Sequence, residues 1–120
     1  MIKSFEDLEI YQLSILLAKD IYRLVKEFPG KEKYIIVDQL MRASTSIGAN
    51  IAEGFGRHTT KEFIKFLYNS RGSLMEVRHF LNLSKDFQYI SNEDFEKITQ
   101  SCNILGVKIN NLISKLSLKL

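Results

Sequence analysis

The sequence predicts an all-α protein, an antiparallel up-down-up-down four-helix bundle that forms a single domain over residues 1–120. Three observations lead to this prediction. Apolar residues recur with helical spacing in four segments, no segment alternates as a strand does, and the connections are short. Short connections favour antiparallel neighbours. We expect the helices at about residues 5–28, 32–55, 60–85 and 92–118.

The first predicted helix carries two apolar stripes. One consists of Leu8, Tyr11, Ile15, Ala18, Tyr22 and Val25, and the other of Ile10, Leu13, Leu17, Ile21, Leu24 and Phe28. By the helical step the stripes lie roughly 100° or more apart. A helix of a monomeric bundle needs only one apolar face, so the second stripe indicates a contact with another protein surface, most simply another copy of the chain. Pro29-Gly30 is expected to end this helix.

The second predicted helix places a small and polar line beside its core face. Ile36, Leu40, Ile47 and Ile51 form that core face. The line beside it consists of Gln39, Ala43, Ser46, Asn50, Glu53 and Arg57. Small residues let two helices approach closely, and a buried Asn fixes register and oligomer state.

We interpret this line as an oligomer interface that faces another helix, with Arg42 and Arg57 available to Glu53. In the alternative, the line is the solvent border of the bundle and Glu53–Arg57 is an ordinary surface pair. Gly54 or Gly56 is expected to adopt the left-handed conformation that ends the helix, and Phe55 to fold back as an apolar plug.

The last two helices begin with clear capping signals. Thr59 and Glu62 form a capping box, and Ser91 is the next expected N-cap, with Asp94 in the reciprocal position. The apolar stripe of the third helix contains Phe63, Leu67, Ser70, Leu74, Val77 and Leu81. The stripe of the fourth contains Phe95, Ile98, Cys102, Leu105, Ile109, Leu112 and Leu116. Such continuous seams suit the small crossing angles of a bundle.

The positive charge of the chain is local. The net charge is +3, and residues 57–79 hold five basic side chains against two acidic ones. The candidate nucleic-acid contacts are therefore Arg57, His58, Lys61, Lys65, Arg71 and Arg78. The alternative is a solvated helix face. A single copy with so few cations would bind nucleic acid weakly, whereas a symmetric assembly multiplies the contacts.

Catalytic chemistry is not indicated. Cys102 lies within an apolar seam, which is typical of an inert core thiol, and the sequence holds no HExxH or CxxC motif. Helical ribonucleases of toxin systems carry an Arg and a His at a spacing that this chain lacks. We predict no enzymatic activity, cofactor, metal or small-molecule substrate. No apolar run reaches the ~18 residues of a membrane span and no signal-peptide layout is present, so a cytoplasmic protein without membrane contact is expected.

Three segments carry a resemblance to a known family. FEDLEIYQ (5–12), QLMRASTSIGANIAEGFGR (39–57) and FIKFLYNSRGSLMEVRHFL (63–81) resemble the four-helix-bundle proteins encoded by intervening sequences of bacterial 23S rRNA genes. The same fold family includes the accessory variability protein of diversity-generating retroelements. The resemblance implies a homopentamer. In the retroelement branch the ring is basic, binds nucleic acid and partners a reverse transcriptase.

The resemblance and the residues together lead to one expected function. We expect a non-enzymatic, oligomeric protein that acts as an accessory factor and binds RNA or DNA. The alternatives are a helical ribonuclease or toxin-like enzyme, and an adaptor that binds only proteins.

Overall fold

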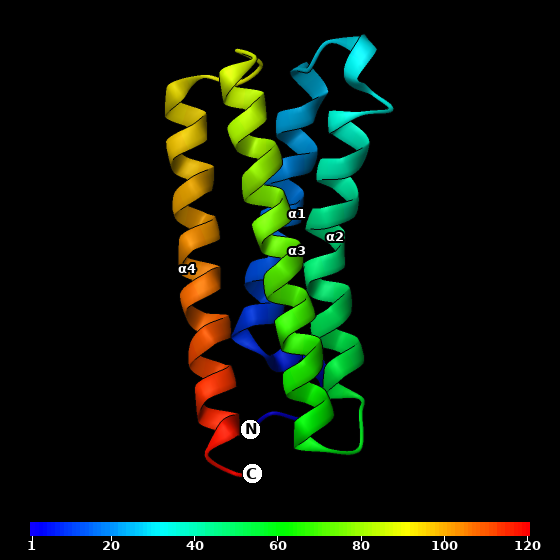
Figure 1. The fold of residues 1–120 in the computed structure, drawn as a ribbon, viewed down its shortest axis with the longest axis vertical. Helices are drawn as coiled ribbons and strands as arrows, with labels where there is room; N and C mark the ends of the chain where they lie inside the picture. The colour runs from blue at the N-terminus through cyan, green and yellow to red at the C-terminus, as the bar shows by residue number, and fades with distance from the viewer.

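Four long helices make up the chain. A computed structural model describes all of residues 1–120. The helices are α1 (Glu9–Leu24), α2 (Ile36–Phe55), α3 (Thr60–Asp86) and α4 (Asn92–Ser117), and no strand is present. They run antiparallel in chain order along an elongated bundle of 46 × 24 × 21 Å (Figure 1). The predicted all-α four-helix bundle is confirmed.

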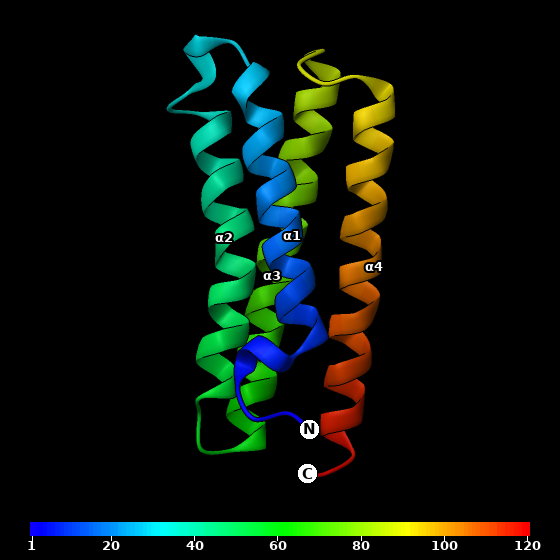
Figure 2. The same cartoon turned by 180° about the vertical axis from the view of Figure 1, so that it is seen from behind.

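Each helix packs against its neighbours in the chain, and α1 also packs against α4. The four helices therefore stand at the corners of a square, with α3 in front in Figure 1 and α1 in front in Figure 2. Both termini and the connection between α2 and α3 lie at one end, which we call the lower end. The other two connections form the upper end.

The predicted first helix is not continuous over residues 5–28. It divides into a 3-10 turn η1 (Phe5–Asp7), helix α1 and a second 3-10 turn η2 (Val25–Glu27), with Leu8 extended between the first two. The carboxylate of Asp7 accepts hydrogen bonds from the main-chain N–H groups of Lys3 and Ser4 at 2.9 and 3.1 Å. These bonds hold the pKa of Asp7 below its ordinary value. They also fix a separate turn ahead of α1.

The second helix starts later than predicted and ends at the predicted residue, Phe55, without the expected cap. A 3-10 turn η3 (Gly30–Glu32) follows Pro29, and α2 starts only at Ile36 because Ile35 has φ −119° and ψ −96°. Gly56 ends α2 with φ −80°, so the expected left-handed glycine is wrong. Gly54 lies inside the helix, where it is buried. Phe55 packs edge-on against Phe63, as the plug prediction required.

The predicted N-caps of α3 and α4 are present, but the reciprocal side-chain bonds of the predicted capping boxes are not formed. Thr59 Oγ1 accepts a hydrogen bond from the main-chain N–H of Glu62 at 3.1 Å, and Ser91 Oγ accepts one from that of Asp94 at 3.1 Å. Each bond satisfies an N–H group that has no partner within its helix. The caps fix where α3 begins, and thereby the position of the basic residues that follow.

The core runs the length of the bundle and contains the predicted stripes of α2, α3 and α4. All four predicted core residues of α2 are buried. On α1, the stripe that includes Leu17 and Ile21 faces the core, whereas the other stripe runs along α2 towards the surface and leaves Ile15 and Tyr22 exposed. No buried side-chain nitrogen or oxygen lacks a hydrogen-bond partner.

Candidate functional site

The small and polar line of α2 lies along the contact with α3 of the same chain. Ala43 is buried, and the hydroxyl groups of Ser46 and Ser73 hydrogen bond at 3.0 Å between the helices. The amide of Asn50 donates to the carbonyl oxygen of Ser46 at 2.9 Å and to its hydroxyl at 3.1 Å. This part of the line therefore faces another helix, and that helix belongs to the same copy.

The charged members of the line lie on the surface. Arg57 pairs with Glu53 at 3.2 Å with both side chains exposed, and its guanidinium stands 4.7 Å from the centre of the Phe66 ring. Arg42 pairs with Asp38 at 2.9 Å instead of Glu53, which corrects the expected pairing. The reason is local, because Asp38 precedes Arg42 by one helical turn and reaches it on the same face. Gln39 is exposed.

The six candidate nucleic-acid residues fall into two groups. Arg57, His58, Lys61 and Lys65 are exposed at the lower end, around the connection between α2 and α3 and the first turns of α3. No carboxylate lies within 4.0 Å of the ammonium groups of Lys61 and Lys65, since neither residue forms a salt bridge.

The second group lies higher on α3, on the side of α4. Arg71 donates a hydrogen bond to Asn110 of α4 at 3.0 Å and covers the ring of Tyr68 at 4.7 Å. Arg78 is exposed and close enough to Cys102 to lower the pKa of its thiol slightly. The structure therefore separates Arg71 and Arg78 from the lower group.

Sequence reasoning missed lysines from the ends of the chain. Lys3, Lys115 and Lys119 are exposed and lie near the termini, at the same end of the bundle as Lys61 and Lys65 (Figure 2). None of the three forms a salt bridge. The alternating helix directions bring these segments together. The predicted up-down topology was the signal that could have identified them. We call Lys3, Arg57, His58, Lys61, Lys65, Lys115 and Lys119 the basic end.

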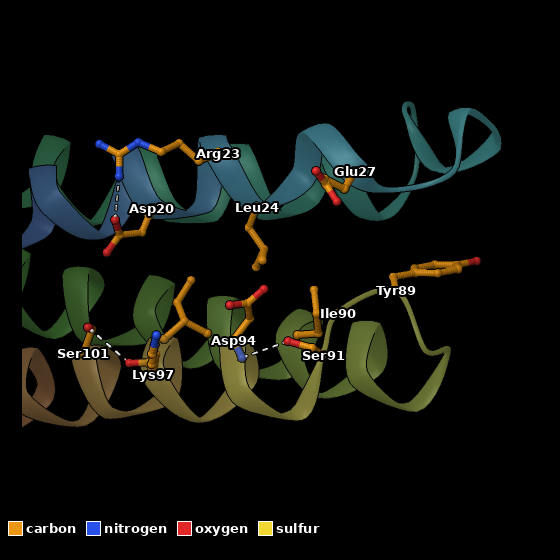
Figure 3. A pocket seen from close by; sticks show the side chains of 11 residues that line it. Asp20, Arg23, Leu24, Glu27, Tyr89, Ile90, Ser91, Asp94, Lys97 and Ser101 are labelled. Carbon is orange, nitrogen blue, oxygen red and sulfur yellow. Dashed lines mark hydrogen bonds and ion pairs between the residues drawn. The ribbon is translucent and has the colours of Figure 1, made fainter.

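A cleft lies between α1 and α4 towards the upper end, away from the basic end (Figure 3). It has a volume of about 580 Å³, with Leu24, Ile90 and Ile98 among its lining residues. Asp94 points towards Leu24 across the gap between the helices (Figure 3). Charged groups of both signs line the cleft, including the Asp20–Arg23 pair. A cleft with this mixed lining suits a small amphipathic group better than a polyanion.

Apolar side chains are exposed on two further surfaces. A shallow groove of about 390 Å³ between α1 and α2 is lined by the apolar side chains of Ile15, Ala18, Tyr22 and Met41 and by the basic side chains of Lys19, Arg23 and Lys26. On α3 and α4, exposed apolar side chains are those of Tyr68, Met75, Ile104 and Val107. The groove between α1 and α2 is a candidate protein contact because its apolar residues are contiguous.

The groups that catalysis would use are apart from one another. Cys102 is completely buried, and burial raises the pKa of its thiol to about 11 against a smaller lowering by Arg78. His58 and His79 are exposed and separated by most of α3, about 30 Å at the helical rise. No group of three or more metal-ligating side chains converges.

No helix has the length and apolar character that a membrane span requires.

These observations define a four-helix-bundle protein with a basic end and exposed apolar surfaces. The chain belongs to the family of 23S rRNA-intervening sequence proteins, whose family model matches residues 6–111. The predicted family is thereby confirmed. No match was found among curated proteins.

A solved structure supports the same fold. A protein of unknown function from the S23 ribosomal protein family of Bacteroides thetaiotaomicron is 26% identical to this chain, with a TM-score of 0.81. The similarity covers 88% of this chain and 95% of that one. The helical architecture is therefore shared over nearly the full length of both proteins.

Proposed function

We propose that this protein is a cytoplasmic, homo-oligomeric accessory factor that binds nucleic acid through its basic end, without catalysing a reaction. The observation that carries the proposal is the group of exposed, unpaired lysines there: Lys3, Lys61, Lys65, Lys115 and Lys119. Lysines without carboxylate partners are free to replace the counterions of phosphate groups. The backbone, rather than the base sequence, would supply most of the affinity.

The basic end also offers groups that suit single strands. His58 is exposed beside Arg57, whose guanidinium lies over the Phe66 ring. Cations beside aromatic rings are typical of surfaces that hold unpaired nucleotides. We therefore propose single-stranded RNA as the preferred partner.

Self-association would raise the affinity of the basic end for RNA. Five or so phosphate contacts from one copy give weak binding that salt removes, whereas several copies around one axis act on the same strand with a high effective concentration. The exposed apolar side chains of α1, α3 and α4 are the proposed source of this assembly. The resemblance to ring-forming relatives leads us to propose a homopentamer.

Two measurements test the proposal. Sedimentation velocity across a hundredfold range of protein concentration gives the mass, and a pentamer is expected; a stable monomer throughout the range would reject the assembly. Fluorescence anisotropy with a labelled single-stranded RNA gives the affinity. Changing Lys61 and Lys65 together to Glu is expected to weaken binding at least tenfold.

Lys31 and Lys33 provide the matched control, because both are exposed lysines at the upper end. Their double Glu variant is expected to bind as the parent does. Equal losses in both variants would show that only net charge matters and would reject the basic end as the site. The same labelled RNA reports cleavage, and specific turnover by pure protein would establish the ribonuclease alternative. An oligomer that binds no RNA would favour the protein-binding adaptor.

A further inference from the structure

Helices α1 and α4 are joined by polar side chains only in the lower half of the bundle. Glu9 of α1 and Lys108 of α4 form an ion pair there at 3.2 Å. Above this pair no hydrogen bond or salt bridge connects the two helices. The upper half of the same groove holds the cleft of about 580 Å³ (Figure 3). Binding sites for small molecules usually have volumes of about 300–1,000 Å³.

The floor of the cleft is apolar. Ile98 of α4 is buried there, and Leu24 of α1 and Ile90 are half-buried. The half-buried Tyr89 lies at the upper end of the cleft (Figure 3). Its hydroxyl donates a hydrogen bond to Glu32 at 3.2 Å, which holds the ring in place. The cleft therefore offers aliphatic and aromatic surface to a ligand.

Two carboxylates border this floor without a partner in the protein. The charged residues that line the cleft are Asp20, Arg23, Glu27, Asp94 and Lys97. Arg23 pairs with Asp20 at 3.0 Å, and Lys97 pairs with Glu93 at 3.2 Å. Glu27 and Asp94 form no salt bridge, and neither carboxylate accepts a hydrogen bond. The positive charges of the cleft are therefore already paired, and the free charge is negative.

The carboxylate of Asp94 is directed into the cleft. Asp94 is the third residue of α4, where an acidic side chain can reach back to the main chain of the N-cap. Its main-chain N–H donates to Ser91 Oγ at 3.1 Å, but its side chain does not return the bond. The carboxylate points across the gap towards Leu24 instead (Figure 3). Glu27 follows Leu24 by one helical turn, so the two carboxylates flank the same apolar floor from the two walls of the cleft.

We infer that this cleft binds a small organic amine, in which an ammonium group is attached to an apolar body. The ammonium group lies beside the carboxylates of Glu27 and Asp94, to which it donates charge-assisted hydrogen bonds. The ring of Tyr89 adds a favourable cation–π contact. The apolar body covers the floor and leaves water. The free charge selects a cation, the floor selects an apolar body, and the volume selects a small molecule.

A bound amine connects α1 and α4 where the protein's own side chains leave them unconnected. Binding to the folded state alone raises its stability by mass action. The cleft lies away from the basic end, and none of its contacts needs a second copy of the chain. The inference therefore rests neither on RNA binding nor on self-association, and the failure of either leaves it standing.

Equilibrium dialysis with 2-phenylethylamine at neutral pH and low salt tests the inference. The parent protein is expected to bind one molecule per chain, with a Kd of about 1 mM for a ligand of this size. Two relatives of the probe are the controls, since 2-phenylethanol keeps the ring without the charge and ethylamine keeps the charge without the ring. Each is expected to bind at least tenfold more weakly. Equal binding of 2-phenylethanol would reject the role of the carboxylates. No saturable binding of the amine, as when a second copy covers the cleft, would overturn the inference.

A pair of amide substitutions locates the binding site. Glu27→Gln combined with Asp94→Asn keeps the size of both side chains and removes their charges, and it is expected to weaken binding of 2-phenylethylamine at least tenfold. The matched control is Asp86→Asn combined with Glu96→Gln, because both residues are exposed near the upper end, form no salt bridge and do not line the cleft. This control is expected to bind as the parent does.

Equal losses in the two double variants would show that only the net charge matters, and would reject the cleft as the site. Far-UV circular dichroism shows whether both variants keep the fold of the parent. The comparison of the three probes on the parent protein decides the inference whether or not the variants fold.

Discussion

A methyl group on Gly54 would stand 2.6 Å from the Cβ atom of Phe66 and 3.0 Å from Cδ1 of Phe63. Gly54 lies in the last turn of α2, and both aromatic residues belong to the start of α3. The missing side chain lets the two helices approach closely at the lower end. Gly54 is therefore required for packing, and its backbone conformation is ordinary for a helix.

This contact reverses the usual effect of replacing a helical glycine. Gly→Ala inside a helix normally stabilises by about 0.5–1 kcal/mol, but the added methyl of Gly54→Ala must displace α3. We expect Gly54→Ala to lower the free energy of unfolding by about 1–3 kcal/mol. The measurement is urea unfolding at one fixed protein concentration.

Gly72 provides the control, because it lies within α3 and a Cβ there meets nothing within 4 Å. Gly72→Ala is expected to stabilise by about 0.5–1 kcal/mol. If Gly54→Ala stabilises to the same degree, the helices are not in close contact at Gly54.

A buried hydrogen bond joins the same two helices at mid-height. The hydroxyl of Ser70 donates to the carbonyl oxygen of Ile47 at 2.9 Å, and the Ser70 side chain is fully buried. Ser70→Ala removes a bond worth about 0.5–1.5 kcal/mol net. Ser114→Ala is the control: Ser114 is exposed in α4, so this change brings the same increase in helix propensity without removing such a bond. We expect Ser70→Ala to be less stable than Ser114→Ala by about 1 kcal/mol in urea unfolding, and equal stabilities would contradict a structural role for the bond.

The buried thiol predicts how stability depends on alkaline pH. Burial raises the pKa of Cys102 from 9.0 to about 11. Between these values the unfolded chain releases the thiol proton while the folded chain keeps it, so the free energy of unfolding falls as pH rises. The full difference is about 2–3 kcal/mol at 1.36 kcal/mol per pKa unit, and it is reached near pH 11.

Cys102→Ala isolates this contribution from the titration of lysines and tyrosines. The parent is expected to lose stability relative to the variant from pH 9 to 11, and to keep a constant difference below pH 8. Thiol-reactive dye should label the folded parent slowly at pH 8, since the thiolate is scarce and the sulfur is covered. Rapid labelling of the native protein at that pH would contradict the burial.

Helical spacing was sufficient to predict the core. Leu40 and Ile47 of α2 and Ile109 of α4 lie where an amphipathic helix must bury them, and all three have no exposed area. The caps at Thr59 and Ser91 were also predictable, because each depends on residues three positions apart. Features that depend on one helix at a time were therefore accessible from the sequence.

Features that depend on specific side-chain contacts, or on contacts between distant segments, could not be predicted from the sequence. The turn at Asp7 interrupts the first helix through main-chain hydrogen bonds that periodicity does not reveal. Arg42 pairs with Asp38, which lies one helical turn earlier, because Glu53 is about 16 Å further along the same helix and pairs with Arg57. Lys61 and Lys115 lie at the same end of the bundle because α3 packs beside α4. This packing brings together segments that are far apart in the chain.

The lysines at the end of α4 give the last prediction, on the salt dependence of RNA binding. For single strands, each phosphate contact contributes about 0.7 to the slope of log affinity against log salt concentration. Because Lys115 and Lys119 are exposed at the lower end without carboxylate partners, their double Ala variant is expected to reduce the slope by about 1.4. The control is the double Ala variant of Lys31 and Lys33, which removes the same charge at the upper end. Anisotropy titrations from 50 to 300 mM salt give both slopes. An unchanged slope in the Lys115/Lys119 variant would exclude the end of α4 from the contact, whereas equal reductions in both variants would mean that the strand has no preferred end of the bundle.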